Sequence, residues 1–168
     1  AENADSLAFD TWGVDYGMLD KDGNLVSKPV CYRDDRTKGM TDKIYQSVSP
    51  SKLYAKTGNE IMPINTLFQL TADGTDNAEM FLFMPDLFAY SLCGAKSVDK
   101  TIASTSQMLD LENVEWQKDI FALSGKNEKI LPPIVNCATV VGEYNGIKVI
   151  KVAGHDTQCA VSAMPCDE

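Results

Sequence analysis

The order of hydrophobic periodicities along the chain constrains its fold more than any other feature. Apolar residues alternate near both ends, as in strands, whereas from Gly39 to about residue 124 they recur at helical spacing. The predicted strands are 7–13, 14–19, 24–30, 139–144 and 147–152, and the predicted helices are 40–48, 50–57, 65–71, 86–93, 115–124 and 158–163. A turn at Asp20–Gly23 would join two of these strands as a hairpin. No linker or repeat interrupts this order, so we expect one domain of α/β or α+β type.

Length and charge exclude several classes of protein. A chain of 168 residues with 44% hydrophobic residues can bury its own core without disulfides or a structural metal. No apolar run is long enough to span a bilayer, and the N-terminus lacks the basic and apolar regions of a secretory leader, so we expect no membrane association. Twenty-four acidic against fifteen basic residues give a net charge of −9, a poor match for DNA or RNA. We therefore expect no nucleic-acid partner.

The cysteines and the acidic turn do not predict a metal site. The five cysteines form no CxxC pair and no zinc-ligand spacing, which favours reduced thiols and a cytoplasmic location. A Cys159–Cys166 disulfide is the alternative. Asp20 and Asp22 resemble the start of a calcium loop, but Cys31 stands where the loop needs its twelfth, acidic ligand.

The segment that follows the last predicted strand carries the sharpest candidate site. The apolar run 149–152 ends in a small-residue turn that presents His155, Asp156 and Thr157 side by side before a helix. Polar groups at the carboxyl end of a strand are where α/β sheets place their sites. Asp156 can accept a proton from a hydroxyl while His155 orients that substrate, and Thr157 with the helix start can support an oxygen-rich ligand. The alternatives are a simple helix cap, or a thiol–imidazole pair of His155 with Cys159.

A second candidate site surrounds a Trp-Gly turn near the N-terminus. Asp10 and Asp15 flank Trp12 and Gly13 in an otherwise apolar stretch. An aromatic face beside bare backbone suits a sugar ring, so Trp12 and Asp15 are substrate-binding candidates. The alternative is a strand bulge with a core tryptophan.

The two arginines of the chain, Arg33 and Arg36, both lie in the tetrapeptide Arg33-Asp34-Asp35-Arg36. Arginine is the planar, bidentate donor among the basic residues. Its concentration here, with Asp34 between the two copies, predicts either a fixed salt-bridge network or an anion contact.

Taken together, these segments resemble a known family. FDTWGVDYGMLD at 9–20 is similar to the IDTWGVDFGLLD signature of rhamnulokinases, which are FGGY carbohydrate kinases, and PVCYRDDRT at 29–37 is similar to their P-x-x-YRDxRT. Further blocks in family order are YAKTG at 54–58, MPINTLFQL at 62–70, MPDLF at 84–88, ASTSQ at 103–107, LPPIV at 131–135 and AGHDT at 153–157. The matches cover nearly the whole chain.

The resemblance implies a fold, a reaction and roles for residues. The fold would be α/β, of the ribonuclease H-like (actin-type ATPase) kind, a partial N-terminal lobe with a helical insertion. The reaction would be ATP-dependent phosphorylation of L-rhamnulose at its 1-hydroxyl, with Asp156 as the catalytic base and Gly13, His155 and Thr157 contacting the sugar. ATP and magnesium would be bound mainly by parts of the protein outside this chain. Neither GxxxxGK[ST] nor GxGxxG occurs, so no nucleotide site is located within it.

This sequence also departs from the family pattern. Ile102 replaces an asparagine before the Ala-Ser-Thr block, which puts the hydrogen bonds of that loop in doubt, and Gly154 replaces a serine before His155. The family has a phosphate loop before the TWGVD segment and a C-terminal lobe after the catalytic loop, and the resemblance implies that both lie outside these 168 residues. We therefore expect residues 1–168 to be one incomplete domain, inactive when isolated and prone to self-association through an exposed sheet edge. The alternatives are a related kinase of fuculose, xylulose or a polyol, and a non-catalytic sugar-binding module.

Overall fold

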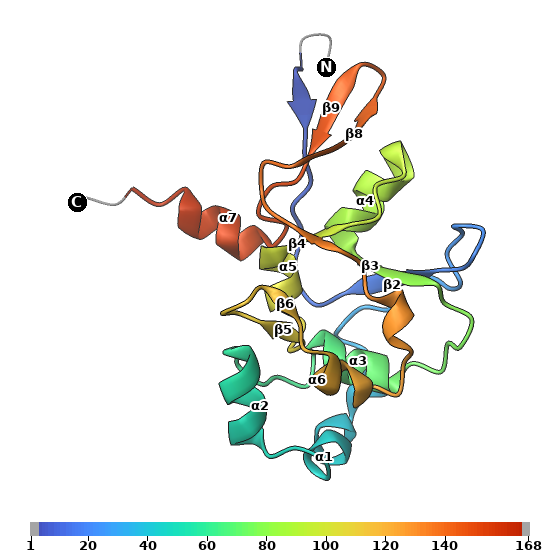
Figure 1. Ribbon diagram of the computed structural model, residues 1–168, viewed down its shortest axis with the longest axis vertical. Coiled ribbons are helices and arrows are strands. Elements are labelled where there is room, and N and C mark those ends of the chain that lie inside the picture. The colour runs from blue at the N-terminus through green and yellow to red at the C-terminus, as the bar shows by residue number, and fades with distance from the viewer. Residues whose placement is uncertain (1–3, 166–168) are drawn as a thin grey trace.

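The computed structural model describes residues 4–165 and shows an elongated molecule with a sheet at one end and helices at the other (Figure 1). The sheet has the strand order β1 (Ser6–Leu7), β9 (Ile147–Ile150), β8 (Val140–Tyr144). β1 runs parallel to β9, and β8 and β9, which correspond to the predicted strands 139–144 and 147–152, form a hairpin. Helix α4 (Met84–Cys93) packs against this sheet, and Val149 lies in the small core between them.

The predicted hairpin of segments 14–19 and 24–30 is only partly formed, because its turn is present but the strand pairing stops after one bridge. β2 (Tyr16–Leu19) pairs antiparallel with β3 (Met80–Phe83), about sixty residues further along the chain, and only an isolated bridge joins Leu19 to Leu25. Segment 24–30 is mostly exposed or half-buried, whereas β2 is buried throughout and β3 almost so. The main strand partner of β2 is therefore the buried, apolar β3, and this pairing keeps apolar surface away from water.

Helices and short strand pairs make up the middle of the chain. The helices are α1 (Met40–Tyr45), α2 (Pro50–Thr57), α3 (Thr66–Ala72), α5 (Lys100–Ser104) and α6 (Lys118–Ala122), with 3-10 turns at Asp35–Thr37 and Glu128–Ile130. The strand pairs are β4 (Val98–Asp99) with β7 (Ile134–Val135), and β5 (Leu109–Asp110) with β6 (Glu115–Trp116). The predicted helix 115–124 is thus partly wrong, because its first two residues form β6. Helix α5 was not predicted.

A large core holds the helical middle against β2 and β3. Four phenylalanines are fully buried in it, namely Phe68, Phe81, Phe83 and Phe121, and Phe81 meets Phe83 edge to face. Helix α7 (Asp156–Ser162) lies outside this core, buries none of its residues and extends sideways from the body in Figure 1. Among residues 4–165, no helix is both long and apolar enough to cross a membrane.

Candidate functional site

Two backbone hydrogen bonds bring the two sharpest candidate segments together. Thr11 N donates to Gly154 O at 2.9 Å, and Asp156 N donates to Thr11 O at 2.9 Å. This parallel bridge joins positions more than 140 residues apart in the sequence. Trp12 and Gly13 consequently lie beside the loop His155–Thr157.

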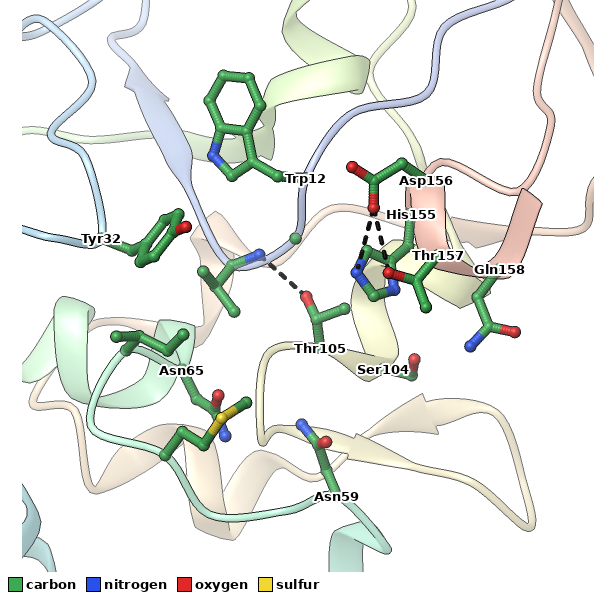
Figure 2. A pocket seen from close by; sticks show the side chains of 14 residues that line it. Trp12, Tyr32, Asn59, Asn65, Ser104, Thr105, His155, Asp156, Thr157 and Gln158 are labelled. Carbon is green, nitrogen blue, oxygen red and sulfur yellow. Dashed lines mark hydrogen bonds and ion pairs between the residues drawn. The ribbon is translucent and has the colours of Figure 1, made fainter. Parts of the chain in front are cut away.

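The joined segments form one wall of a pocket of about 360 Å³. Its lining comprises Trp12, Gly13, Val14, Tyr32, Asn59, Met62, Ile64, Asn65, Ser104, Thr105, His155, Asp156, Thr157 and Gln158. In Figure 2, Trp12 and Asp156 lie on one side of the pocket, and Asn59 and Asn65 lie opposite. Amides, hydroxyls, a carboxylate and an imidazole thus share a hollow with aromatic faces, which suits a small polyhydroxylated ligand.

Asp156 is the carboxylate of this pocket. It is the first residue of α7, and its side chain is 53% exposed, so a substrate hydroxyl can reach it. Thr157 Oγ1 donates to Asp156 Oδ1 at 3.3 Å, and His155 Nε2 lies 3.7 Å from the same oxygen. The second oxygen, Oδ2, has none of these contacts and remains available to accept a proton.

Buried acidic groups fix the loop that carries Asp156. Asp99 Oδ2 accepts from Gly154 N at 3.0 Å, while Asp99 Oδ1 accepts from Thr101 N at the start of α5. Lys151 and Asp86 form a buried ion pair at the end of β9, and burial raises the pKa of Asp86 to about 7 against the opposing effect of the Lys151 ammonium. The loop is therefore held at both ends by side chains from other elements.

Gly154 belongs to this arrangement. A Cβ at Gly154 would collide with Asp99 and meet Pro85 Cγ at 3.3 Å. The glycine that departs from the family pattern is thus the residue that admits Asp99 to the backbone of the loop.

The loop after α5 makes its hydrogen bonds without the asparagine of the family pattern. Ile102 is fully buried in the core, and three following hydroxyls each donate to the carbonyl three residues earlier. These are Ser104 to Thr101 at 2.7 Å, Thr105 to Ile102 at 2.8 Å and Ser106 to Ala103 at 2.6 Å. Thr105 Oγ1 also accepts from Val14 N at 3.1 Å and so joins α5 to the Trp-Gly segment.

A buried amide network lies behind Asn65, which lines the pocket. Asn65 Nδ2 donates to Gln107 Oε1 at 2.6 Å and to Glu60 O at 2.8 Å, and Gln107 Nε2 donates to Thr57 Oγ1 at 2.6 Å. Gln107 adopts φ +66, an uncommon conformation for a residue other than glycine. The pocket residues Asn65, Ser104 and Thr105 were not predicted as site residues, although the blocks that contain them are among those that resemble the family.

The remaining candidates lie away from the pocket lining. Asp15 is buried behind the pocket and only 2% exposed, and Arg36 approaches Asp73 at 3.8 Å beneath it. Arg33 is exposed and lies over the ring of Tyr32, 5.3 Å from its centroid. Asp34 Oδ1 accepts from Arg36 N and caps the 3-10 turn. The arginine loop therefore touches the pocket through Tyr32.

The described residues do not form a metal site or an activated thiol. Within 4–165, no three His, Cys, Asp or Glu side chains gather closely enough to hold a metal ion. Burial raises the pKa of Cys159, whose Sγ donates to Ala153 O at 2.9 Å, so the thiol is not poised as a nucleophile beside His155. Cys166 lies outside the described residues, and with it the alternative Cys159–Cys166 disulfide.

Comparison with known proteins adds a family and a fold. Residues 1–168 match the family model for the N-terminal domain of the FGGY family of carbohydrate kinases. Similar solved structures include xylulose kinase from Rhodospirillum rubrum, with 17% identity and a TM-score of 0.86 over 98% of this chain and 37% of that one. Gluconate kinase from Lactobacillus acidophilus has 15% identity and a TM-score of 0.78 over 90% of this chain and 34% of its own. Plasmodium falciparum glycerol kinase with ADP has 16% identity and a TM-score of 0.79 over 92% of this chain and 35% of its own.

These likenesses confirm the expected mixed α/β, ribonuclease H-like (actin-type ATPase) fold of a partial N-terminal domain. The chain spans about a third of the length of the structures it matches.

Proposed function

The chain belongs to the FGGY family of carbohydrate kinases, and we propose that the protein containing it transfers a phosphoryl group from ATP to the 1-hydroxyl of L-rhamnulose. The bridge between Thr11 and the loop Gly154–Asp156 is the observation that carries this proposal. It puts a carboxylate, an imidazole and a hydroxyl beside a Trp-Gly wall in one pocket. A ketose chain needs that combination of hydrogen-bonding groups and apolar surface.

In the proposed reaction, Asp156 acts as the general base. The 1-hydroxyl of the sugar gives its proton to Asp156 Oδ2 as its oxygen attacks the γ-phosphorus of ATP, and the bond from that phosphorus to the β,γ-bridging oxygen breaks, releasing ADP. His155 and Thr157 orient the hydroxyl, and Gly13 lets the sugar approach the backbone. Phosphoryl transfer depends mainly on such positioning and on neutralising charge.

FGGY kinases use ATP, generally with magnesium. Among residues 4–165, no three His, Cys, Asp or Glu side chains gather closely enough to hold that metal. We propose that the ATP and magnesium sites lie mainly in the rest of the protein.

Asp156→Asn in the full-length protein tests the assigned base. We expect ATP-dependent phosphorylation of L-rhamnulose to fall by about 10²–10⁴-fold while the Kd for the sugar changes little, because the amide keeps the shape but cannot take the proton. Asp119→Asn is a matched control, since that carboxylate pairs with Lys56 on the surface. Intact phosphorylation by Asp156→Asn would exclude it as the base and favour a sugar-binding module.

The identity of the sugar is a separate part of the proposal. It rests on the segments TWGVD and HDT, whereas the solved structures named above are kinases of xylulose, gluconate and glycerol. Measuring kcat/KM of the full-length protein for L-rhamnulose, L-fuculose and D-xylulose decides between them. A preference for either of the other ketoses overturns the L-rhamnulose assignment and leaves the kinase assignment intact.

We further propose a cytoplasmic location, inactivity of the isolated 168 residues and self-association through the edge of β1. Within the described part of the chain, β1 pairs on one side only, with β9. An unpaired strand edge can add another strand. Sedimentation velocity of the isolated chain over a concentration series tests the self-association, and ATP-dependent phosphorylation by that chain would contradict the inactivity.

A further inference from the structure

A line of hydrogen bonds runs from the rim of the pocket into the core. Trp12 Nε1 donates to Asp15 Oδ2 at 2.9 Å, Gln69 Nε2 donates to Asp15 Oδ1 at 3.2 Å, and Arg36 Nη2 donates to Gln69 Oε1 at 2.6 Å. Asp15 and Gln69 are 2% and 0% exposed, so no ligand reaches them. Trp12, at 44% exposed, is the member of the line that faces the pocket.

The direction of every bond in this line is fixed by chemistry. An indole N–H and a guanidinium can only donate, and they stand at the two ends. Gln69 must therefore turn its oxygen to Arg36 and its amino group to Asp15, and both oxygens of Asp15 must accept. The amino group of Gln69 also donates to Ile64 O at 2.8 Å, which opposes a flip of the amide.

The inner end of the line is itself anchored. The guanidinium of Arg36 lies over the ring of Tyr16, 5.8 Å from its centroid, and 3.8 Å from Asp73 Oδ2. Tyr16 OH donates to the same carboxylate oxygen at 3.1 Å. Arg36 is thus held on two sides, which leaves it little freedom to release Gln69.

A half-exposed tryptophan does not need this support for its own sake. Water would satisfy its indole N–H at the surface, so the hydrogen bond adds little net stability there. Burying the carboxylate of Asp15, in contrast, costs free energy unless each oxygen finds a donor. Two buried polar side chains and an arginine therefore support one indole at the rim of the pocket.

From this geometry we propose that Asp15, Gln69 and Arg36 are positioning residues that fix the plane of the Trp12 indole, against which the carbon chain of the sugar packs. The inference rests on the proposed sugar-kinase function of the same pocket. An indole held in place before the sugar arrives avoids the entropy cost of ordering it during binding. Arg36 thereby acts on substrate binding from a position that touches no substrate.

Steady-state kinetics of the full-length protein test the proposal through a double-mutant cycle. Asp15→Asn places an amide opposite the amino group of Gln69, so one orientation loses the bond to Gln69 and the other loses the bond to Trp12. We expect the KM for the ketose to rise about threefold to tenfold, the value of one hydrogen bond, with the KM for ATP unchanged. Trp12→Phe keeps an aromatic face without the N–H and should give a rise of similar size.

The double variant separates positioning from a general structural role. If Asp15 acts through the indole, Asp15→Asn should raise the ketose KM no further in the Trp12→Phe background. Rises that multiply, or a fall in kcat with both KM values unchanged, would overturn the proposal. Asp119→Asn serves as the control carboxylate and should leave both KM values unchanged.

A second measurement needs no substrate. In full-length protein labelled with 5-fluorotryptophan, the ¹⁹F resonance of Trp12 is identified by its absence in Trp12→Phe. Asp15→Asn should shift or broaden this resonance and leave the other tryptophan resonances in place; an unchanged Trp12 signal would refute the positioning role. If the wild-type protein phosphorylates no ketose, the proposed function fails, and this spectrum still decides whether Asp15 holds the indole.

Discussion

Replacing Gly13 with alanine puts a methyl group into the wall of the pocket. The new Cβ would lie 2.8 Å from Thr105 Cγ2 and 3.0 Å from both Thr105 Cβ and Oγ1. Carbon atoms in contact are ordinarily about 3.5–4.0 Å apart, so Thr105 or the Trp-Gly segment must move by about 0.7 Å. Thr105 cannot simply rotate, because its hydroxyl donates to Ile102 O and accepts from Val14 N.

The cost follows from these two effects. Overpacking costs about 1–3 kcal/mol, and weakening the bond between Val14 and Thr105 adds about 1 kcal/mol. We expect Gly13→Ala to lower the free energy of unfolding by about 2–4 kcal/mol in total. For a unit of this size each kcal/mol lowers the melting temperature by about 2–4 °C. The KM for the ketose should rise as well, because the methyl group and the displaced Thr105 both narrow the pocket.

Two further variants make this prediction specific. Thr105→Ser removes the Cγ2 atom of the shortest contact and keeps the hydroxyl, so in the Gly13→Ala background it should restore part of the lost melting temperature. Gly74→Ala is the control, since a Cβ there meets nothing within 4 Å. Differential scanning calorimetry and ketose kinetics on the full-length protein measure both effects. The reasoning is refuted if Gly13→Ala is no more destabilising than Gly74→Ala, or if Thr105→Ser deepens the loss.

Two other predictions concern buried charge. Burial alone would raise the pKa of Asp73, but hydrogen bonds from Thr75 and Tyr16 bring it below the ordinary 3.8. Its ionised form therefore stabilises the native state above about pH 4, and that contribution is lost as the pH falls further. Asp73→Asn should flatten the fall in melting temperature below about pH 4, and an unchanged slope would contradict this. Lys151→Met leaves the carboxylate of Asp86 buried without its cation and should lower the free energy of unfolding by about 3–5 kcal/mol. Adding Asp86→Leu should recover most of this loss, as measured by calorimetry. A double variant as unstable as Lys151→Met alone would contradict the prediction.

Local sequence signals mark parts of the candidate site, but they do not give strand pairing. Trp12 and His155 each lie in a segment that the sequence marks as a candidate, and the structure brings the two into one pocket. The hairpin 14–30 forms only its turn and one bridge, and its turn signal says nothing about β3, which lies some sixty residues further on and pairs along the whole of β2. The sequence around Thr105 does not predict its place in the pocket wall either, because that place depends on a hydrogen bond with Val14, which is distant in the sequence.

The contrast between local motifs and contacts of distant residues also explains which substitutions should affect this pocket. Its ligand-facing groups come from short, locally recognisable motifs, but their directions are set by buried polar groups such as Asp15, Asp99 and Gln69. Each of these makes bonds whose donor and acceptor ends cannot be exchanged without leaving a buried group unpaired. Substitutions at these three buried positions should therefore alter substrate binding, although none of the three side chains lines the pocket.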